Sequence, residues 1–450
     1  MKKIIETIKN IWKIEELRTR ILFTILMVLV YRFGSYVVLP GINPEFLTKL
    51  QEQTSGGLMG LIDMFSGGAF SNASIFALGI MPYISASIVI QLLGMAVPYF
   101  QKLQREGESG RRKMNQITRY LTVAILLIQG PAYLANLGSQ LRQAGIAGGL
   151  PAGPWFIMSS VITLAAGSMF VMWLGERITD KGLGNGISFI ILIGIIARFP
   201  GAIIKEFASR FSGSELGGGV VFIAEIVFLL FVIAMSIMLV QGTRKIPVQY
   251  AKRVVGNKQY GGVRQYLPLK VNAAGVMPII FAQAIMFLPI TLAGFANSET
   301  VSSFIRPFVD HTSFGYNFAF ALMIIAFTYF YTAVTVNPTN MAEEMKRNNG
   351  FIPGVKPGKR TAEYIDTIMS RITLPGSIFL AIVAILPAFA SLIGISREFS
   401  QFFGGTSLLI LVGVVLDTLQ QVESHLLMRH YDGLLKSGRI KGRSGSVAAY

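Results

Sequence analysis

The sequence contains no cysteine and only three histidines, His311, His425 and His430. Without cysteine, the chain has no disulfide, no thiol nucleophile and no thiolate ligand for a metal. The histidines are too few and too widely separated to form a metal cluster. We therefore expect neither a metal centre nor a cofactor held by such ligands.

Charged residues are also scarce, at 14% of the chain, whereas hydrophobic residues make up 52% and the mean hydropathy is +0.56. Ten hydrophobic runs have roughly the 20 residues that a helix needs to cross about 30 Å of hydrocarbon. They cover residues 20–38, 75–97, 117–136, 154–175, 185–204, 219–241, 274–293, 316–336, 374–394 and 404–425. The pattern predicts an all-α integral membrane protein with ten transmembrane helices.

Lysine and arginine alternate between rich and poor connections along the chain. Of the 40 such residues, 32 are assigned to the N-terminal segment, every second connection and the C-terminal tail, 7 are assigned to the intervening segments, and Arg32 lies inside the first run. The positive-inside rule places the rich segments and both termini in the cytosol. Orientation and attraction to anionic lipids explain the net charge of +17 better than nucleic-acid binding does, although a basic loop can still dock an acidic partner.

Sequence signatures of energy conversion are missing. There is no GxxxxGK[ST] loop, and the glycine-rich run 182–186 precedes a membrane span rather than part of a βαβ unit. The span centres carry almost no ionisable residues, which leaves Glu225 and Asp417 as weak candidates for ion coupling. The sequence predicts no enzyme, and any uphill transport must draw its energy from a partner.

The chain divides at the glycine-rich stretch FSGSELGGG. We expect an N-terminal half over 1–210, a hinge linker over 211–218 and a C-terminal half over 219–450. Because each half has five spans, an odd number, the two halves begin on opposite sides of the membrane. A shared fold would therefore be an inverted repeat, with a functional interface between the two halves. Residues 1–19 show no cleavable signal peptide and form an amphipathic segment expected to lie along the cytosolic face.

The segment 57–70 is apolar but too short to span, and it contains a glycine pair. It is either a re-entrant half helix that folds back into the bundle or an interfacial segment on the outer headgroups. The residues alone leave both possibilities open.

Two basic cytosolic loops, 242–273 and 337–373, are long for a compact bundle and are therefore candidates for partner docking. Residues 244–252, RKIPVQYAK, predict a hairpin-like arm with Pro247 at an edge position. The second loop contains the turn-rich run 352–360, and residues 362–371 are compatible with a short helix.

Uncharged polar side chains lie inside several spans. Amides and hydroxyls in lipid seek partners across helix interfaces, with contributions of about 1 kcal/mol or less each. These side chains either stabilise ordinary helix packing or lie at a helix interface that can open. The candidates are Ser85, Ser87, Gln91, Gln129 and Gln283.

Five long runs resemble the SecY/Sec61 family of protein-translocation channels, in order and over essentially the whole chain. They are MFSGGAFSNASIFALGIMPYISASIVIQLL (64–93), EGESGRRK (106–113), MWLGERITDKGLGNGIS (172–188), LPLKVNAAGVMP (267–278) and FGGTSLLI (403–410). The resemblance implies an hourglass pore between two inverted five-helix halves, closed by an aliphatic ring and a re-entrant plug helix. It implies a channel that passes unfolded secretory polypeptides across the bacterial plasma membrane and releases signal and transmembrane segments sideways into lipid.

The same resemblance implies roles for individual residues. The pore ring would be Ile80, Ile84, Ile191, Ile280, Ile285 and Ile410. The plug, over 57–72, would include Gly57, Leu61, Asp63, Met64, Phe65, Ser66, Gly67 and Gly68. A lateral gate formed by the second, third, seventh and eighth spans would hold the five polar residues named above. Docking would use Arg244, Lys245, Lys252, Arg253, Lys356, Lys359 and Arg360.

The implied partners are the SecA ATPase or the ribosome with its acidic RNA surface, the SecE and SecG subunits, signal-bearing polypeptides and anionic lipids. Lys356 departs from the arginine that the family usually has in this turn, and lysine lacks the bidentate fork of arginine. Two rival functions predict different sensitivities. A secondary transporter would depend on Glu225 or Asp417, and a ribosome tether would depend on the basic loops but not on the isoleucines.

Overall fold

The computed structural model describes residues 12, 14–43, 63–143, 151, 153–212, 218–250, 253–255, 258–260, 264–283, 285, 286 and 313–436. The first half contains helices α2 (Glu15–Gly34), α5 (Met81–Ala96), α6 (Pro98–Arg105), α7 (Glu108–Gln143), α8 (Pro154–Lys181) and α9 (Gly186–Ser212). The second half contains α10 (Gly218–Gln241), α13 (Phe314–Thr335), α14 (Pro338–Arg347), α15 (Lys359–Leu392), α16 (Arg397–Ser400) and α17 (Gly405–Lys436). Its strands are β1 (Thr243–Tyr250), β2 (Arg253–Val255), β3 (Lys258–Tyr260), β4 (Arg264–Lys270) and β5 (Gly350–Phe351).

Within the described residues, seven helices are long and apolar enough to cross a membrane, and the bent pair α5 and α6 makes an eighth. These eight coincide with eight of the ten predicted runs. The first run lies largely in α2, whose arginines Arg18, Arg20 and Arg32 shorten its apolar length. Only 277–283, 285 and 286 of the seventh run are described as helical. The helical membrane architecture is confirmed, and the count of ten stays a prediction.

Several helices extend well beyond the apolar runs that predicted them. α7 begins at Glu108 rather than 117, and α15 begins at Lys359 rather than 374. The helix expected over 362–371 is therefore confirmed, but it is not a short one, because these residues form part of the first turns of α15. Hydropathy detects the part of a helix that lies in hydrocarbon, whereas lysine, arginine and glutamate continue a helix readily outside it.

The linker between the halves is shorter than 211–218. α9 continues through Phe211 and Ser212, and α10 already begins at Gly218. The Phe211 ring lies 4.3 Å from that of Phe207, which is in turn 5.5 Å from the ring of Phe222 on α10. Aromatic packing between the two helices therefore extends both of them into the glycine-rich stretch.

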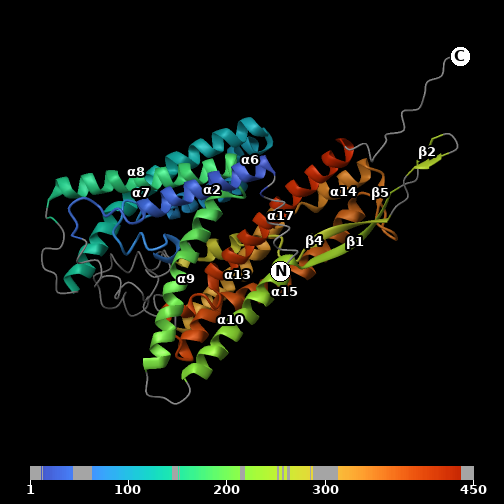
Figure 1. Cartoon of the computed structure of the whole chain (residues 1–450). Coiled ribbons are helices and arrows are strands. Elements are labelled where there is room, and N and C mark those ends of the chain that lie inside the picture. Colours follow the sequence, from blue (N-terminus) through green and yellow to red (C-terminus); the bar gives the residue numbers. More distant parts are fainter. Residues whose placement is uncertain are drawn as a thin grey trace.

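Each half has its own hydrophobic core, and a third core joins them. Figure 1 shows α2, α7 and α8 side by side in one group and α10, α13, α15 and α17 in another, with α9 between the groups. One core lies within the first half, around Leu126, Leu137 and Leu164. A second lies within the second half, around Ile324 and Leu380. The third draws side chains from both halves.

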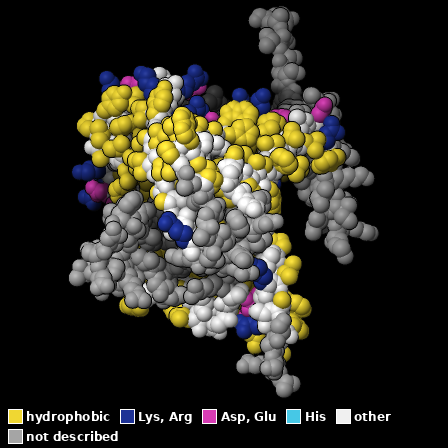
Figure 2. Space-filling model, turned by 90° about the vertical axis from the view of Figure 1, so that its left-hand side faces the viewer, with side chains coloured by type: hydrophobic (Ala, Val, Ile, Leu, Met, Phe, Trp, Pro, Cys, Tyr) yellow, Lys and Arg dark blue, Asp and Glu magenta, His cyan; other side chains and the backbone are white. Residues whose placement is uncertain are grey.

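The outer surface of the helices is strongly apolar. Phe33, Ile128 and Val220 are 78%, 74% and 74% exposed, and Figure 2 shows hydrophobic side chains across the upper part of one face with lysine and arginine along its rim. A water-soluble protein rarely exposes contiguous apolar patches on this scale. This surface is suited to lipid.

The two basic loops join in one small sheet at the end of the second half, here called the sheet end. β1 pairs antiparallel with β4, from Thr243 opposite Lys270 to Gln249 opposite Arg264, which confirms the hairpin. On its other side β1 pairs with β5, Gln249 opposite Phe351. β1 is thus the central strand of the order β4-β1-β5. β5 pairs only with Gln249 and Tyr250, so Pro247 has no partner strand on that side of β1. The N–H that proline lacks is therefore not needed for a hydrogen bond there.

Candidate functional site at the junction of the two halves

The segment from Asp63 to Ile80 folds into the junction as a series of turns. Residues 63–65 form one helical turn, and Gly67 and Gly68 then adopt φ angles of 64° and 93°. Positive φ ends a right-handed helix and favours glycine. A helix over the whole of 57–72 is therefore wrong for the described residues. Gly57 and Leu61, which the sequence analysis assigned to the plug, lie outside them.

Side chains from neighbouring helices hold the backbone of this segment. The Tyr31 hydroxyl on α2 donates to the Ser66 carbonyl at 3.0 Å, and Arg32 Nη1 donates to the Gly67 carbonyl at 2.8 Å. The Tyr133 hydroxyl on α7 donates to the Phe70 carbonyl at 2.9 Å. These bonds satisfy backbone carbonyl groups that would have no hydrogen-bond partner within a helix.

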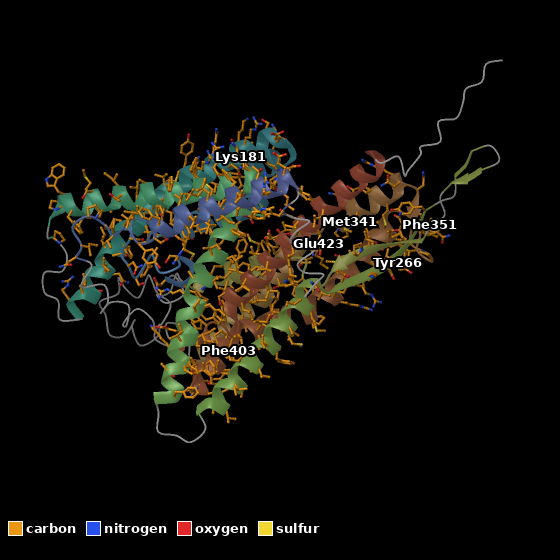
Figure 3. The ribbon with its side chains drawn as sticks, viewed as in Figure 1. Lys181, Tyr266, Met341, Phe351, Phe403 and Glu423 are labelled. Atoms are coloured by element: carbon orange, nitrogen blue, oxygen red, sulfur yellow. The ribbon has the colours of Figure 1, made fainter. Side chains whose placement is uncertain are left out.

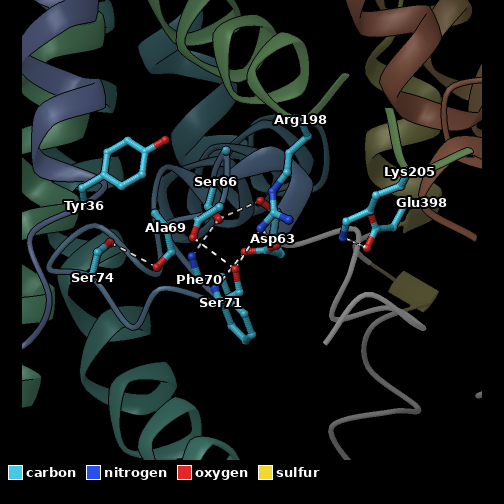
Figure 4. Close-up of polar contacts among 12 residues, drawn as sticks. Tyr36, Asp63, Ser66, Ala69, Phe70, Ser71, Ser74, Arg198, Lys205 and Glu398 are labelled. Carbon is cyan, nitrogen blue, oxygen red and sulfur yellow. Dashed lines mark hydrogen bonds and ion pairs between the residues drawn. The ribbon is translucent and has the colours of Figure 1, made fainter. Parts of the chain in front are cut away.

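An ion pair fastens the same segment to α9 (Figure 4). Asp63 Oδ2 pairs with Arg198 Nη2, which also donates to Ser71 Oγ at 2.8 Å. Asp63 Oδ1 accepts the Ser71 N–H at 2.7 Å. Arg198 was not among the site residues predicted from the sequence. Its signal was a charge inside the apolar run 185–204, since a charge within a membrane helix needs a partner.

Five of the six pore-ring isoleucines converge in the core that joins the halves. Ile80, Ile191 and Ile410 are buried, with Ile84 and Ile280 half-buried against them. Met64 and Phe65 of the segment just described belong to the same core. Ile285 is half-buried and is not among the described members of that core. Their role as a ring stays a prediction, but the structure places these five side chains and the plug residues together.

The structure does not bring the lateral-gate amides together. Gln91 Nε2 donates to Ser87 Oγ at 3.3 Å within α5, and Gln283 Oε1 accepts from Thr406 on α17 at 2.8 Å. Ser85 and Gln129 are half-buried on α5 and α7. The amides of Gln91 and Gln283 thus bond to hydroxyls of their own half, and their role at a lateral gate stays a prediction.

The basic docking residues gather at the sheet end. Arg244 and Lys245 are exposed on β1. Lys356 is exposed in the turn before α15, and Lys359 and Arg360 are exposed at the start of that helix. Lys252 and the side chain of Arg253 lie outside the described residues. Tyr266, Met341 and Phe351 lie together at this end, far from Phe403 (Figure 3).

A small core of its own supports the sheet end. It joins Ile246 and Val248 of the first loop to Met345, Ile352 and Ile365 of the second. The Thr361 hydroxyl also donates to the Lys356 carbonyl at 2.9 Å and closes the turn before α15. The two loops therefore form one platform rather than two independent arms.

Glu225 and Asp417, the acidic residues that an ion-coupled transporter would need, both contact other side chains of the protein. Glu225 Oε1 lies 2.6 Å from Arg210 Nη2, and Arg210 also pairs with Glu206 at 3.0 Å and donates to the Gly394 carbonyl at 3.0 Å. Asp417 is exposed and accepts from Gln421 Nε2 at 3.3 Å. This arrangement fits structural pairing better than ion coupling.

Comparison with known proteins agrees with this geometry. A family model described as SecY matches residues 74–419. The protein translocase subunit SecY of Halalkalibacterium halodurans is 44% identical over 435 residues, covering 96% of this chain and 99% of that protein. The subunit of the same name from Aquifex aeolicus is 41% identical over 439 residues, with coverages of 96% and 99%.

Solved channel structures share the fold. One, described as the structure of a protein conducting channel, has a TM-score of 0.58 at 18% identity, covering 94% of this chain and 95% of that one. Another, Sec61 in the canine ribosome-channel complex from the endoplasmic reticulum, has a TM-score of 0.54 at 17% identity, with coverages of 94% and 95%. Together with the family match over most of its length, these findings show that the chain belongs to the SecY family.

Proposed function

We propose that this chain forms the pore through which a partner motor or a ribosome drives unfolded secretory polypeptides, and from which signal and transmembrane segments leave sideways into lipid. The observation that carries the proposal is the core at the junction. There, isoleucines from α5, α9 and α17 and from the helical turns at 277–283 meet each other and the segment that contains Met64 and Phe65.

The side chains of this core are suited to a seal that blocks ions at rest and opens for a passing polypeptide. Branched aliphatic side chains offer no hydrogen bond that would trap a passing side chain, and a narrow apolar constriction excludes ions by dewetting. The segment that contains Met64 and Phe65 packs against the same side chains, which supports a role as the plug of this constriction. Separate cores in the two halves allow the halves to move apart without unfolding.

The basic platform is the proposed docking surface for the SecA ATPase or for the acidic RNA surface of the ribosome. The charge bias of the loops supports a cytosolic position for the platform and both termini, and we expect the chain to lie in the bacterial plasma membrane. The apolar outer surface leaves room for the SecE subunit around the two halves and for SecG at the periphery. Anionic lipid headgroups are the remaining proposed ligand of the basic rim.

Crosslinking tests the pore directly, because the chain has no native cysteine. We would introduce Ile84→Cys, stall a signal-bearing polypeptide that carries one cysteine in mid-passage, and measure the disulfide adduct. Ile84 is half-buried in the junction core, so a chain passing through that core must contact it. We expect efficient crosslinking at this position.

Leu29→Cys is the matched control, because Leu29 is 61% exposed on the outer face of α2. We expect no adduct there. Equal crosslinking at both positions, or none at Ile84 in a preparation that demonstrably engages the polypeptide, would reopen the transporter and tether functions.

A further inference from the structure

We propose that the ion pair between Asp63 and Arg198 is a latch that keeps the plug segment, here residues 63–74, on the first half after the two halves begin to separate. This inference rests on the proposed channel function. It predicts that plug release needs a second step, the rupture of this ion pair, in addition to the opening of the seam.

The segment is held in two different ways. Met64 and Phe65 pack against isoleucines of both halves, and such apolar contact is non-directional and weakens as the surfaces part. The side chains shown above to bond to the segment, those of Tyr31, Arg32, Tyr133 and Arg198, all belong to the first half, as does the Leu39 N–H that donates to the Ala73 carbonyl at 2.9 Å. Moving the second half away therefore removes apolar contacts but leaves these directional bonds in place.

Asp63 is the strongest of these attachment points. Its side chain is only 7% exposed, and its two oxygens face Arg198 and the Ser71 N–H. A carboxylate at this depth needs a compensating charge, and removing one partner leaves the other uncompensated. Hydrogen bonds to charged groups also contribute more than neutral ones.

The backbone is shaped to admit the arginine. A Cβ at Gly68 would lie 3.2 Å from Arg198 Nη2, and a Cβ at Gly67 would lie 2.7 Å from Arg32 Nη1 and 2.9 Å from Gly194 Cα. The glycine pair thus lets one guanidinium from α9 and another from α2 reach the same turn. Figure 4 shows Arg198 reaching Asp63 and Ser71.

The latch lies at the edge of a small cavity where the halves meet. Asp63 and Arg198 line it together with Glu398, Gln401 and Phe402 of the second half. Glu398 is already paired with Lys205 at 2.8 Å. Arg198 is 32% exposed, so water has access to the ion pair once the seam widens.

The test uses the full chain assembled in lipid bilayers, with the resting ion conductance as one readout. The second readout is the labelling of a single cysteine at Met64 by a membrane-impermeant maleimide. We expect Asp63→Asn and Arg198→Gln each to raise both by roughly tenfold, because each removes a charge-assisted hydrogen bond. The double variant should leak no more than the leakier single variant, since both remove one interaction.

Two further variants guard against misfolding. Ser71→Ala keeps the charges and removes only the hydroxyl bonded to Arg198, so it should raise both readouts by a smaller factor. Arg112→Gln breaks an exposed ion pair with Glu108 within α7, which involves neither the plug segment nor the second half, and should leave both readouts unchanged. Conductance and labelling equal to those of the original chain in Asp63→Asn would overturn the latch, as would additive effects in the double variant.

The Ile84→Cys crosslink separates this outcome from failure of the channel proposal. A normal crosslink together with unchanged leakage in Asp63→Asn would refute the latch alone. Absence of the crosslink in the otherwise unaltered chain would refute the channel function itself.

Discussion

At the scale of single residues, the backbone of the plug segment packs directly against the backbone of α9 at Gly194. A Cβ at Gly194 would lie 2.6 Å from the Phe65 carbonyl and 3.1 Å from the Gly67 nitrogen. Both are backbone atoms, which cannot rotate away as a flexible side chain can. The isoleucine contacts and the ion pair described above depend on this approach.

Gly194→Val should therefore push the plug segment off α9 and raise the resting ion conductance several-fold. Gly201→Ala on the same helix is the matched control, because a Cβ there meets nothing within 4 Å. Conductance measured in planar bilayers distinguishes the two variants. Equal conductance for both would mean that the segment does not seal the pore through its seat on α9.

The cluster formed by Glu206, Arg210 and Glu225 makes a second residue-scale prediction, about stability. Arg210→Met would leave two buried carboxylates without their cation, and breaking a buried pair in this way typically costs about 3 kcal/mol or more. Glu225→Gln should cost less, because Arg210 keeps Glu206, and it should leave translocation intact.

The measurement is the midpoint of thermal unfolding of the purified protein in detergent. Arg112→Met is the control, because its partner Glu108 is four residues earlier in the chain and both side chains are about 80% exposed. Such an exposed pair contributes about 1 kcal/mol or less. Loss of translocation in a well-folded Glu225→Gln variant would contradict the structural role and favour ion coupling.

The residues of the site differ in how far the sequence could reveal them. The isoleucines could be named only through the family resemblance, because six isoleucines in apolar spans look like ordinary core. Arg198 could be found from its position in an apolar run, but its partner Asp63 is 135 positions away in the chain, and no local pattern links the two. The bond between Gln283 and Thr406, 123 positions later, likewise has no local sequence signal, and the predicted gate role of Gln283 stays a prediction.

At the scale of elements, hydropathy located most helix starts and missed the charged extensions. The apolar runs predict the beginnings of α8, α9 and α10 within a residue or so, because these helices start where the hydrocarbon-matching segment starts. The charged turns of α7 lie outside such a segment and were not expected to belong to the helix, and those of α15 were expected to form only a short helix. The hairpin of the first basic loop was predictable from its own residues, whereas its pairing with β5 was not, since the two strands are distant in the chain.

A disulfide tests the joining of the two basic loops. Gln249 and Phe351 lie directly opposite each other across β1 and β5, and residues in such pairs have Cα atoms about 4.5–5.5 Å apart, within the range that a disulfide spans. Gln249→Cys with Phe351→Cys should oxidise readily and leave docking unimpaired. After proteolytic cleavage of the chain between the two loops, the disulfide would hold the two pieces together. The crosslink is then visible as a shift in electrophoretic mobility.

Lys245→Cys with Phe351→Cys is the control pair. Lys245 lies four residues before Gln249 on β1, which is roughly 13 Å along a strand, so this pair should not bridge. Equal oxidation of both pairs would show that the loops move independently rather than as one platform.

At the scale of the whole molecule, the two halves are joined through α9 at several levels, which include the ion pair between Lys205 and Glu398 of α16. The junction core lies in the middle, the Arg210 cluster reaches Glu225 on α10, and the Gly184 N–H before α9 donates to Gln421 Oε1 on α17 at 3.0 Å. Each half also keeps a core of its own. The covalent link between α9 and α10 therefore contributes little to holding the halves together.

This arrangement predicts that the chain can be divided without losing its assembly. Two fragments that end and begin between Ser212 and Gly218, expressed together, should copurify through an affinity tag on one of them, because the junction core and the Arg210 cluster lie outside the cut. Adding Arg210→Glu to the first fragment would place three carboxylates together and should lower recovery of its partner severalfold. Recovery that is equally high with Arg210→Glu would show that the cluster does not join the halves. Failure of the unaltered fragments to copurify, with each fragment stably inserted, would show that the apolar junction alone is too weak to hold them, so that opening of the seam must be limited by the linker.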